Sequence, residues 1–385
     1  MKIFVIPSWY PYPSNPINGT FFKDHAEKLQ ASGHDVTVVA TEIISLKGIF
    51  SSRPDLGKKI YSENNVKTYQ NVLLNRHPGN FPKFYERYKK EFNILLEEAI
   101  KKEGLPDLFH VHSSLWAGAA LCDMKPGVPI IVSEHIKEFL IPDAFDDFQH
   151  KLIQYTYNNI QGLIAPSSSV MEAIQSTFKI PDSCKTQVIP NMVDTDYFVP
   201  LKDKPDNERF SFLIVAMLRP EKRIDTIIQA FIPIGNNFLA RLNILGDGPE
   251  YKNLHTISEE FHLDRLVKFL KKKGRTEVLN AMQKTDVCLL FSEMETFGVT
   301  LIEALSCGIP VIGGNVGGAN DIITPENGLI VPTDDPKALQ QAMKYMINNI
   351  ENYDRDKIRD DAVKRFDTKV VIAALEKFYK SLILK

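Results

Sequence analysis

Two glutamates stand in a stretch of the sequence that is otherwise apolar and rich in glycine. Glu295 and Glu303 lie within residues 292–323, which read SEMETFGVTLIEALSCGIPVIGGNVGGANDII. Burying a carboxylate without a partner costs several kcal/mol, so both side chains need hydrogen-bond donors. FGVTLIEALSCG predicts a loop that opens a largely buried helix, whose first backbone N–H groups lack internal partners and suit an anion such as phosphate. Glu295 precedes this helix, and Glu303 lies about one turn inside it.

A cationic pair follows an apolar strand elsewhere in the sequence. Arg219 and Lys222 come directly after FLIVAML, at the carboxyl end of the predicted strand. Arginine suits bidentate contact with phosphate, and lysine acts as a point charge. A helix N-terminus supplies only roughly half a positive charge, so an anion with several charges needs such cations as well.

The elements that must position these residues are short apolar strands that alternate with longer amphipathic segments. This alternation predicts parallel sheets covered by helices, and it restarts after a segment rich in proline and charge, residues 187–210. We therefore expect an α/β protein of two doubly wound, Rossmann-like domains that face each other across a cleft. The expected boundaries are 1–192, a linker at 193–208, and 209–365. The expected strands are 2–6, 35–40, 108–112, 129–135, 162–167, 210–218, 240–249, 266–270, 286–291, 310–314 and 328–332.

Composition narrows the function classes. The formal net charge of −2 gives no overall attraction to nucleic acid, so we expect no nucleic-acid partner. The four cysteines form no CxxC pair, which indicates buried thiols in a reducing compartment. No apolar run approaches the ~18 residues of a membrane span. We therefore expect a cytoplasmic protein.

Several motifs together resemble the retaining glycosyltransferases of the GT-B fold, family four (glycosyl transferases group 1). The match is spread over nearly the whole chain, and it departs from the usual pattern at Thr296, Arg223 and Asp321. The motifs are ETFGVTLIEALSCGIPVIGGNVGG, which is similar to the family's E-x(7)-E signature and glycine loop, MLRPEKRID, LGDGPE, VIPNMVDTDYF and GHDVTVV.

The resemblance implies roles for the two glutamates and the helix between them. Glu303 would hold the ribose hydroxyls of a nucleotide, and Glu295 would hold the hydroxyls of the transferred sugar. The backbone at Phe297, Gly298 and Val299 would face the diphosphate and the sugar. The alternative is that both carboxylates serve structural salt bridges or helix caps.

The resemblance also implies contacts for residues on other loops. Arg219 and Lys222 would bind the diphosphate, with exposed cations at a helix start as the alternative. Gly19 would lie across the cleft from the donor, and Gly246 would line the cleft. His135, after the strand PIIVSEH, would lie close to the reacting anomeric centre, unless it only bonds to nearby backbone.

We expect no metal and no other cofactor. His110 and His112 alternate along one strand, and we expect their side chains to point to opposite faces, so that they cannot share an ion. Asp194 and Asp196 form a DTD motif that is similar to a metal-binding motif of another glycosyltransferase fold. Here they lie in the predicted linker, where aspartates commonly shape turns.

Two further segments have expected roles. The helix 81–104 interleaves aromatic residues with Lys83, Arg87, Lys89 and Lys90, and such a face either contacts an anionic membrane or is an ordinary solvated helix. Residues 366–385 resemble the family's last helix, which crosses back to the first domain. LVKFLKKKG, at 266–274, would form a strand and loop against the nucleobase.

The sequence therefore predicts a retaining transferase that moves a sugar from a nucleotide-sugar donor to a glycan or lipid-linked acceptor, in surface polysaccharide or glycoconjugate synthesis. Two alternatives remain open: a sugar-nucleotide epimerase of the same fold, and a catalytically silent subunit that binds a sugar nucleotide. A Rossmann dehydrogenase is disfavoured, because no GxGxxG follows the first strand.

Overall fold

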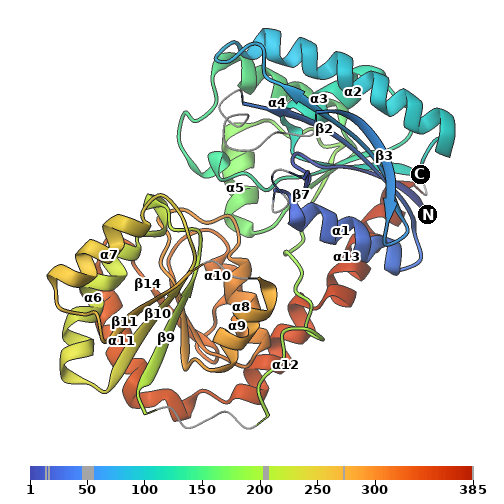
Figure 1. Ribbon diagram of the computed structural model, residues 1–385. Helices are drawn as coiled ribbons and strands as arrows, with labels where there is room; N and C mark the ends of the chain where they lie inside the picture. The colour runs from blue at the N-terminus through green and yellow to red at the C-terminus, as the bar shows by residue number, and fades with distance from the viewer. Residues whose placement is uncertain (14, 16–17, 46–55, 203–207, 272–273, 384–385) are drawn as a thin grey trace. The chain divides into compact units, whose positions relative to one another are not determined.

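The computed structural model (Figure 1) describes residues 1–385 except 14, 16–17, 46–55, 203–207, 272–273 and 384–385. The described chain divides into two compact units. The first unit comprises Met1–Pro166, Met171–Ile189 and Ile372–Lys385, and the second comprises Ser167–Val170 and Pro190–Val371. The C-terminal helix therefore returns to the first unit at Ile372, although the chain before it belongs to the second.

The first unit contains an eight-stranded sheet with the order β3-β4-β2-β1-β5-β6-β7-β8. All neighbouring strands are parallel except β3 and β4, which form an antiparallel pair. Five of these strands match the predicted ones. The strands are β1 (Lys2–Ile6), β2 (Asp35–Ile44), β3 (Gly57–Glu63), β4 (Val66–Leu74), β5 (Leu108–His112), β6 (Ile130–Ser133), β7 (Gly162–Ala165) and β8 (Lys185–Val188).

Helices connect most strands of the first unit, because parallel strands need crossover connections. α1 packs on β2, and α2 packs on β2 and β4. α1 ends at Ala31, and Gly33 just beyond it takes a φ of +90°, as the predicted glycine terminus requires. The helices are α1 (Thr20–Ala31), α2 (Phe81–Glu103), η2 (Ser114–Gly118), α3 (Ala119–Met124), η3 (Lys137–Leu140), α4 (Asp147–Asn159), α5 (Ser168–Thr177) from Met171 onward, and the end of α13 (Thr368–Ile383).

The antiparallel hairpin of β3 and β4 was not predicted from the sequence. These strands carry many polar residues, because β3 lies at the sheet edge and exposes much of its length. The turn did carry a signal: Asn64 and Asn65 have φ values of +49° and +63°, and consecutive asparagines favour the left-handed backbone of tight hairpin turns.

The second unit contains a six-stranded parallel sheet with the order β11-β10-β9-β12-β13-β14. Each of its strands was predicted. The central strands β9 and β12 are almost entirely buried, as a strand covered on both faces must be. The strands are β9 (Phe210–Val215), β10 (Ala240–Leu245), β11 (Val267–Leu270), β12 (Val287–Leu290), β13 (Val311–Gly314) and β14 (Gly328–Val331).

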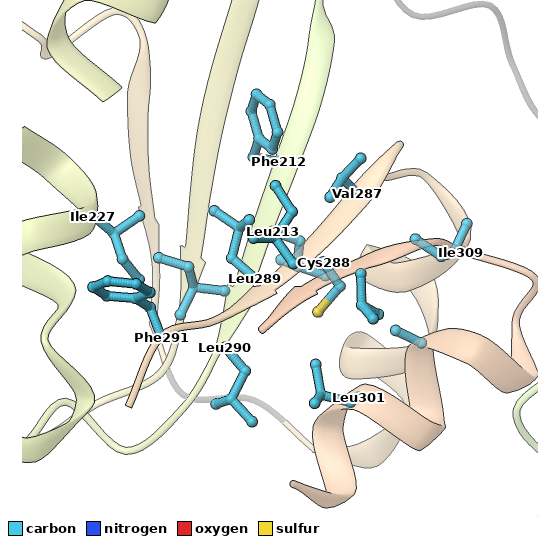
Figure 2. Close-up of a cluster of buried hydrophobic side chains, with 14 of the residues drawn as sticks. Phe212, Leu213, Ile227, Val287, Cys288, Leu289, Leu290, Phe291, Leu301 and Ile309 are labelled. Atoms are coloured by element: carbon cyan, nitrogen blue, oxygen red, sulfur yellow. The ribbon is translucent and has the colours of Figure 1, made fainter. Parts of the chain in front are cut away.

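The core of the second unit lies between this sheet and its helices. Leu301 of α9 belongs to the same buried cluster as Leu289 and Leu290 of β12 (Figure 2). This packing fixes the helix that follows the predicted phosphate loop. The helices are η4 (Pro220–Lys222), α6 (Ile224–Asn237), α7 (Tyr251–Glu260), α8 (Arg275–Gln283), α9 (Val299–Ser306), α10 (Ala319–Ile322), α11 (Pro336–Asn349), η5 (Ile350–Asn352), α12 (Arg355–Phe366) and the start of α13.

The first part of the predicted linker is packed rather than extended through solvent. Val193 and Phe198 are buried in the core of the second unit. The backbone of Val193 bonds to Phe366 at 2.9 Å, and Arg359 donates to the Phe198 carbonyl oxygen at 2.9 Å. This segment is therefore a structural part of the second unit.

Candidate active site

An ion pair joins two of the residues that the sequence analysis selected. Lys222 Nζ lies 2.7 Å from Glu295 Oε2 and 3.4 Å from Ser292 Oγ. The two loops are also joined through backbone, because Glu293 N donates to the Glu221 carbonyl oxygen at 2.8 Å. The end of β9 and the end of β12 thus bring a cation and a carboxylate into contact, although they lie far apart in the sequence.

Arg219 lies beside this pair in the chain but is exposed. Within the described residues its guanidinium makes no hydrogen bond and no ion pair, whereas Lys222 is engaged by Glu295. Arg223 follows with a φ of +48°, a left-handed conformation that suits glycine. This explains physically why glycine is usual at that position in the family that the chain resembles. Thr296, the other departure from glycine in this region, has no positive φ.

Close packing of glycines shapes the loop that carries Glu295. A Cβ atom on Gly317 would lie 1.5 Å from the Glu295 carbonyl oxygen, and one on Gly318 would lie 2.5 Å from that of Phe297. Real Cβ atoms do not approach so closely, so the GGNVGG loop must carry glycine where it supports the Glu295–Phe297 backbone. The sequence shows these glycines, but their contact with the Glu295 loop depends on tertiary structure.

The predicted phosphate loop opens helix α9 as expected. Gly298 precedes the helix with a φ of +102°, which only glycine adopts readily. The backbone N–H groups of the first turn have no partner inside the helix, and Thr300 Oγ1 ties this turn to the Val215 carbonyl oxygen of β9 at 3.3 Å. The Phe297 side chain is buried against Phe366, so only its backbone is available to a ligand.

Glu303 lies one turn inside α9 and differs sharply from Glu295. Burial raises the pKa of Glu303 to about 7, and the nearby positive charge of Arg275 opposes this rise. Within the described part of the chain its carboxylate accepts no hydrogen bond. A carboxyl group with open acceptor sites suits the hydroxyl groups of a sugar.

Arg275, which lies near Glu303, was not selected from the sequence. Its guanidinium lies 4.5 Å from the centre of the Tyr197 ring, and part of the predicted nucleobase loop before it, Lys272 and Lys273, lies outside the described residues.

Gly246 packs against the strand end that leads to Arg219. Its Cβ would lie 1.9 Å from the Ala216 carbonyl oxygen. Next to it, Leu218 N donates to the Asp247 carbonyl oxygen at 2.9 Å. The GDGPE turn therefore holds the Arg219 segment in place, and contact of Gly246 with a donor remains a prediction.

The first unit carries the other two predicted site residues. Gly19 has a φ of +67° directly before α1, and its Cβ would lie 2.2 Å from the Trp9 carbonyl oxygen, so no side chain fits there. His135 follows β6, and its Nε2 lies 3.0 Å from His112 Nδ1. Burial, with a smaller effect of His25, lowers the pKa of His135 to about 3, so this imidazole is neutral near pH 7.

The predicted orientation of His110 and His112 is wrong. Residues two apart on a strand point to the same face, and their ring centres lie 4.4 Å apart. His110 Nε2 lies 2.7 Å from Ser133 Oγ, and its Nδ1 lies 2.7 Å from Tyr379 OH. Burial holds the pKa of both histidines well below its usual range, with smaller effects of the neighbouring imidazoles.

These two histidines and His25 offer nitrogen atoms that lie within 4.8 Å of one another. Tetrahedral coordination at the usual bond length needs nitrogen pairs about 3.4 Å apart, so an ion would require the rings to close together. Both nitrogens of His110 already have partners, whereas His25 Nδ1 and His112 Nε2 are buried without a hydrogen-bond partner among the described residues. The expectation that the protein needs no metal stays a prediction.

The DTD motif makes local contacts. Asp194 Oδ1 accepts a hydrogen bond from Tyr197 N at 3.1 Å, as an aspartate that shapes a turn does. The exposed Asp196 side chain lies 3.5 Å from Lys369 Nζ.

The two parts of the chain match two family models of known proteins. Residues 19–197 match the family model described as Glycosyltransferase Family 4, and residues 200–364 match Glycosyl transferases group 1. The chain belongs to the group 1 glycosyltransferases. It has the GT-B fold of two Rossmann-like units, and it is a nucleotide-sugar-dependent transferase.

Relatives of this glycosyltransferase act on different acceptors. It is 25% identical to N-acetyl-alpha-D-glucosaminyl L-malate synthase of Bacillus anthracis, over 96% of this chain and 94% of the relative. It is 27% identical to the phosphatidylinositol N-acetylglucosaminyltransferase gpi3 subunit of Schizosaccharomyces pombe, over 63% of this chain and 52% of the relative.

Solved structures share the fold at low sequence identity. Sucrose-phosphate synthase from Thermosynechococcus elongatus has a TM-score of 0.80 at 19% identity, with both chains fully covered. Anabaena HepE in complex with UDP has a TM-score of 0.72 at 18% identity, over 99% of this chain and 100% of that chain. None of the described helices combines the length and the apolar character that crossing a membrane requires.

Proposed function

We propose that this glycosyltransferase retains the anomeric configuration and transfers a sugar to a glycan or lipid-linked acceptor, in the synthesis of a surface polysaccharide or glycoconjugate. The observation that carries the proposal is the contact of Lys222 with Glu295, 2.7 Å apart in the second unit. It places a cation that suits phosphate beside a carboxylate that suits sugar hydroxyls. Glu303, without a hydrogen-bond partner among the described residues, is proposed to accept from the ribose of the nucleotide.

The proposed reaction is a front-face displacement. The bond between sugar C1 and the departing phosphate oxygen breaks, and its electron pair goes to that oxygen. The acceptor hydroxyl oxygen bonds to C1 from the same face, and its proton moves to the departing phosphate oxygen. Arg219, Lys222 and the first turn of α9 stabilise the developing phosphate charge. His135 contacts the transferred sugar as a neutral imidazole.

We further propose that the transfer needs no divalent metal, although the structure changes the charge argument. Arg219, Lys222 and a helix N-terminus supply about 2.5 positive charges. The Lys222–Glu295 ion pair offsets one of these charges, which leaves about 1.5 beside a diphosphate that carries about two or more. Support for the proposal comes from the DTD motif, because Asp194 accepts a hydrogen bond from Tyr197 N, as a turn aspartate does, and Asp196 lies beside the cation of Lys369.

Peripheral contact with an anionic membrane, in the cytoplasm, is proposed on a smaller surface than the sequence suggests. Lys89 lies 3.2 Å from Asp123, and Arg87 donates to the Leu74 carbonyl oxygen. Lys83 and Lys90 remain exposed on this face of α2. Each lysine near an anionic surface contributes about 1 kcal/mol, so any such attraction is weak and falls with salt. Co-sedimentation with phosphatidylserine vesicles at low and high salt tests it.

A donor panel tests the proposed function. The protein is incubated with UDP- and GDP-sugars, with and without glycan and lipid-linked acceptors, and the products are examined by NMR. The proposal expects a new glycoside with the anomeric configuration of the donor, formed only with acceptor. Isomerisation of the donor without acceptor would indicate the epimerase alternative, and binding without turnover would indicate the silent subunit. An inverted product would contradict the retaining mechanism.

A further inference from the structure

The ring of His135 has one nitrogen that is already engaged and one that is open. Its Nε2 lies 3.0 Å from His112 Nδ1, and both residues belong to the first unit. Within the described residues its Nδ1 makes no hydrogen bond, and the side chain is half-buried. A sugar that contacts His135 through a ring nitrogen therefore meets Nδ1.

Both imidazoles are neutral near pH 7. Burial lowers the pKa of His135 to about 3 and holds the pKa of His112 well below its usual range. A neutral imidazole carries a proton on one ring nitrogen and a lone pair on the other. One of the two rings must therefore donate across the 3.0 Å contact, and the other must accept. The direction of this hydrogen bond decides whether Nδ1 of His135 carries a proton.

The surroundings of His112 decide this direction. Its Nε2 is buried and has no hydrogen-bond partner among the described residues. His25 Nδ1 is buried without a partner as well, and no hydrogen bond joins it to His112. Proteins rarely leave a buried N–H without an acceptor, and they leave acceptor lone pairs unfilled more often. The proton of His112 is therefore expected on Nδ1, so that His135 Nε2 accepts the hydrogen bond.

Contacts within the first unit hold the two rings in this arrangement. His112 ends β5 and lies opposite Ser133 of β6, the strand that leads to His135. The Ser8 hydroxyl donates to the His112 carbonyl oxygen. The Phe22 ring centre lies 4.8 Å from that of His112 and 5.4 Å from that of His135. The hydrogen bond between the two imidazoles therefore has a fixed direction in space.

We propose that His112 is a positioning residue, whose Nδ1–H donates to His135 Nε2 and so fixes the tautomer of His135 with its proton on Nδ1. His135 thereby presents an N–H donor, and not a lone pair, to an oxygen atom of the transferred sugar. The inference rests on the proposed contact of His135 with that sugar. The hydrogen bond at one ring nitrogen sets which nitrogen of a histidine is protonated. Without such a partner a neutral histidine side chain favours the proton on Nε2, which would leave Nδ1 as an acceptor.

Nitrogen-15 NMR of the full chain tests the proposal without any substrate. The nine histidines are labelled, and the signals of each ring show which nitrogen carries the proton. Spectra of His135→Gln and His112→Leu identify the two rings by the signals that disappear. We expect a proton on Nδ1 and none on Nε2 in both rings near pH 7. A proton on Nε2 of His135 in the wild type overturns the proposal.

Variants of His112 test whether it sets the tautomer of His135. His112→Leu removes the hydrogen-bond donor and leaves no polar atom of its own behind, so the fold should survive. We expect the proton of His135 to move to Nε2. We also expect kcat/KM for the nucleotide-sugar to fall roughly tenfold, as for the loss of one hydrogen bond. His112→Asn, whose amide N–H takes the place of Nδ1–H, should restore the tautomer and most of the activity.

His150→Leu is the matched control. It removes another histidine of the first unit, which stacks on Phe178 at 4.5 Å, and it should change neither the tautomer of His135 nor the kinetics. An unchanged tautomer in His112→Leu, or a loss of activity that His112→Asn does not restore, overturns the role of His112 alone. A shifted tautomer with normal transfer kinetics instead overturns the contact of His135 with the sugar, which belongs to the proposed function.

Discussion

The two units use the ends of their parallel strands in opposite ways. In the second unit, strand ends present charged groups: exposed Arg219 and the ion pair of Lys222 with Glu295. In the first unit, the corresponding region holds neutral imidazoles and aromatic rings, and burial lowers the pKa of His25 to about 4 and that of His135 to about 3. One fold type thus builds a charged surface in one unit and an uncharged one in the other.

The difference follows from how each region is supported. Glycines let the loops of the second unit approach one another at backbone distance, and the Lys222 and Glu295 side chains keep 22% and 18% of their surface exposed. In the first unit, bulky rings pack together and exclude water, which favours the neutral form of each histidine. A charged leaving group belongs to the first kind of surface, and a neutral sugar suits the second.

The largest expected effect comes from removing the cations of the second unit. Arg219→Ala and Lys222→Ala should each lower kcat by roughly 100- to 1,000-fold, since one preorganised charge is typically worth ~2.7–4 kcal/mol in the barrier. Steady-state transfer assays measure this. Lys252→Ala, which removes an exposed cation of α7, is the matched control and should have normal kinetics. Normal kinetics in Arg219→Ala would remove this residue from the site.

The second prediction concerns glycine support of the charged loop. Gly317→Ala should lower the free energy of unfolding by about 2–3 kcal/mol and reduce turnover, because its Cβ would lie 1.5 Å from the Glu295 carbonyl oxygen. Gly127→Ala is the control, because Gly127 also has a positive φ, +77°, but no atom lies within 4 Å of its Cβ. If both substitutions lower the free energy of unfolding in urea by the same amount, the close contact of Gly317 with Glu295 does not contribute to stability.

The third prediction concerns the buried histidines of the first unit, which should make the stability of the protein depend on pH in acid. The histidine pKa values are lower in the folded state than the usual ~6.5, so below this pH the unfolded state binds more protons. Stability should be fully present above pH 6.5 and fall toward pH 4, by about 1.4 kcal/mol per pH unit for each histidine. His25→Leu should flatten the dependence measured by urea unfolding, whereas His255→Leu, a control whose side chain is 45% exposed, should not. An identical slope in both variants would contradict a neutral buried cluster.

The smallest effect is expected at the DTD motif. Asp196→Asn should leave donor affinity nearly unchanged, and transfer should persist in excess EDTA, because these aspartates make local contacts. Loss of activity in EDTA that magnesium or manganese restores would show that a metal compensates the missing positive charge. Wild-type protein without EDTA is the reference.

Sequence patterns predicted most strands, because buried parallel strands are continuous apolar runs. The hairpin of β3 and β4 was not predicted, because polar edge strands lack continuous apolar runs. The residue types around Glu295 and Lys222 indicated a phosphate and sugar site, but their ion pair depends on tertiary contact between two loops. The expectation that His110 and His112 point to opposite faces was wrong, because residues two apart on a strand lie on the same face.

The central claim is that the second unit holds the nucleotide through Glu303 and the first turn of α9. Calorimetric titration of UDP into the wild type and into Glu303→Gln across pH 6–8.5 tests it most directly. Because burial raises the pKa of Glu303 to about 7, we expect wild-type affinity to rise as the pH increases through 7 and the carboxylate ionises. Glu303→Gln should bind UDP at least tenfold more weakly at pH 8, with little dependence on pH. Equal affinity and an equal pH profile in the two proteins would contradict the account.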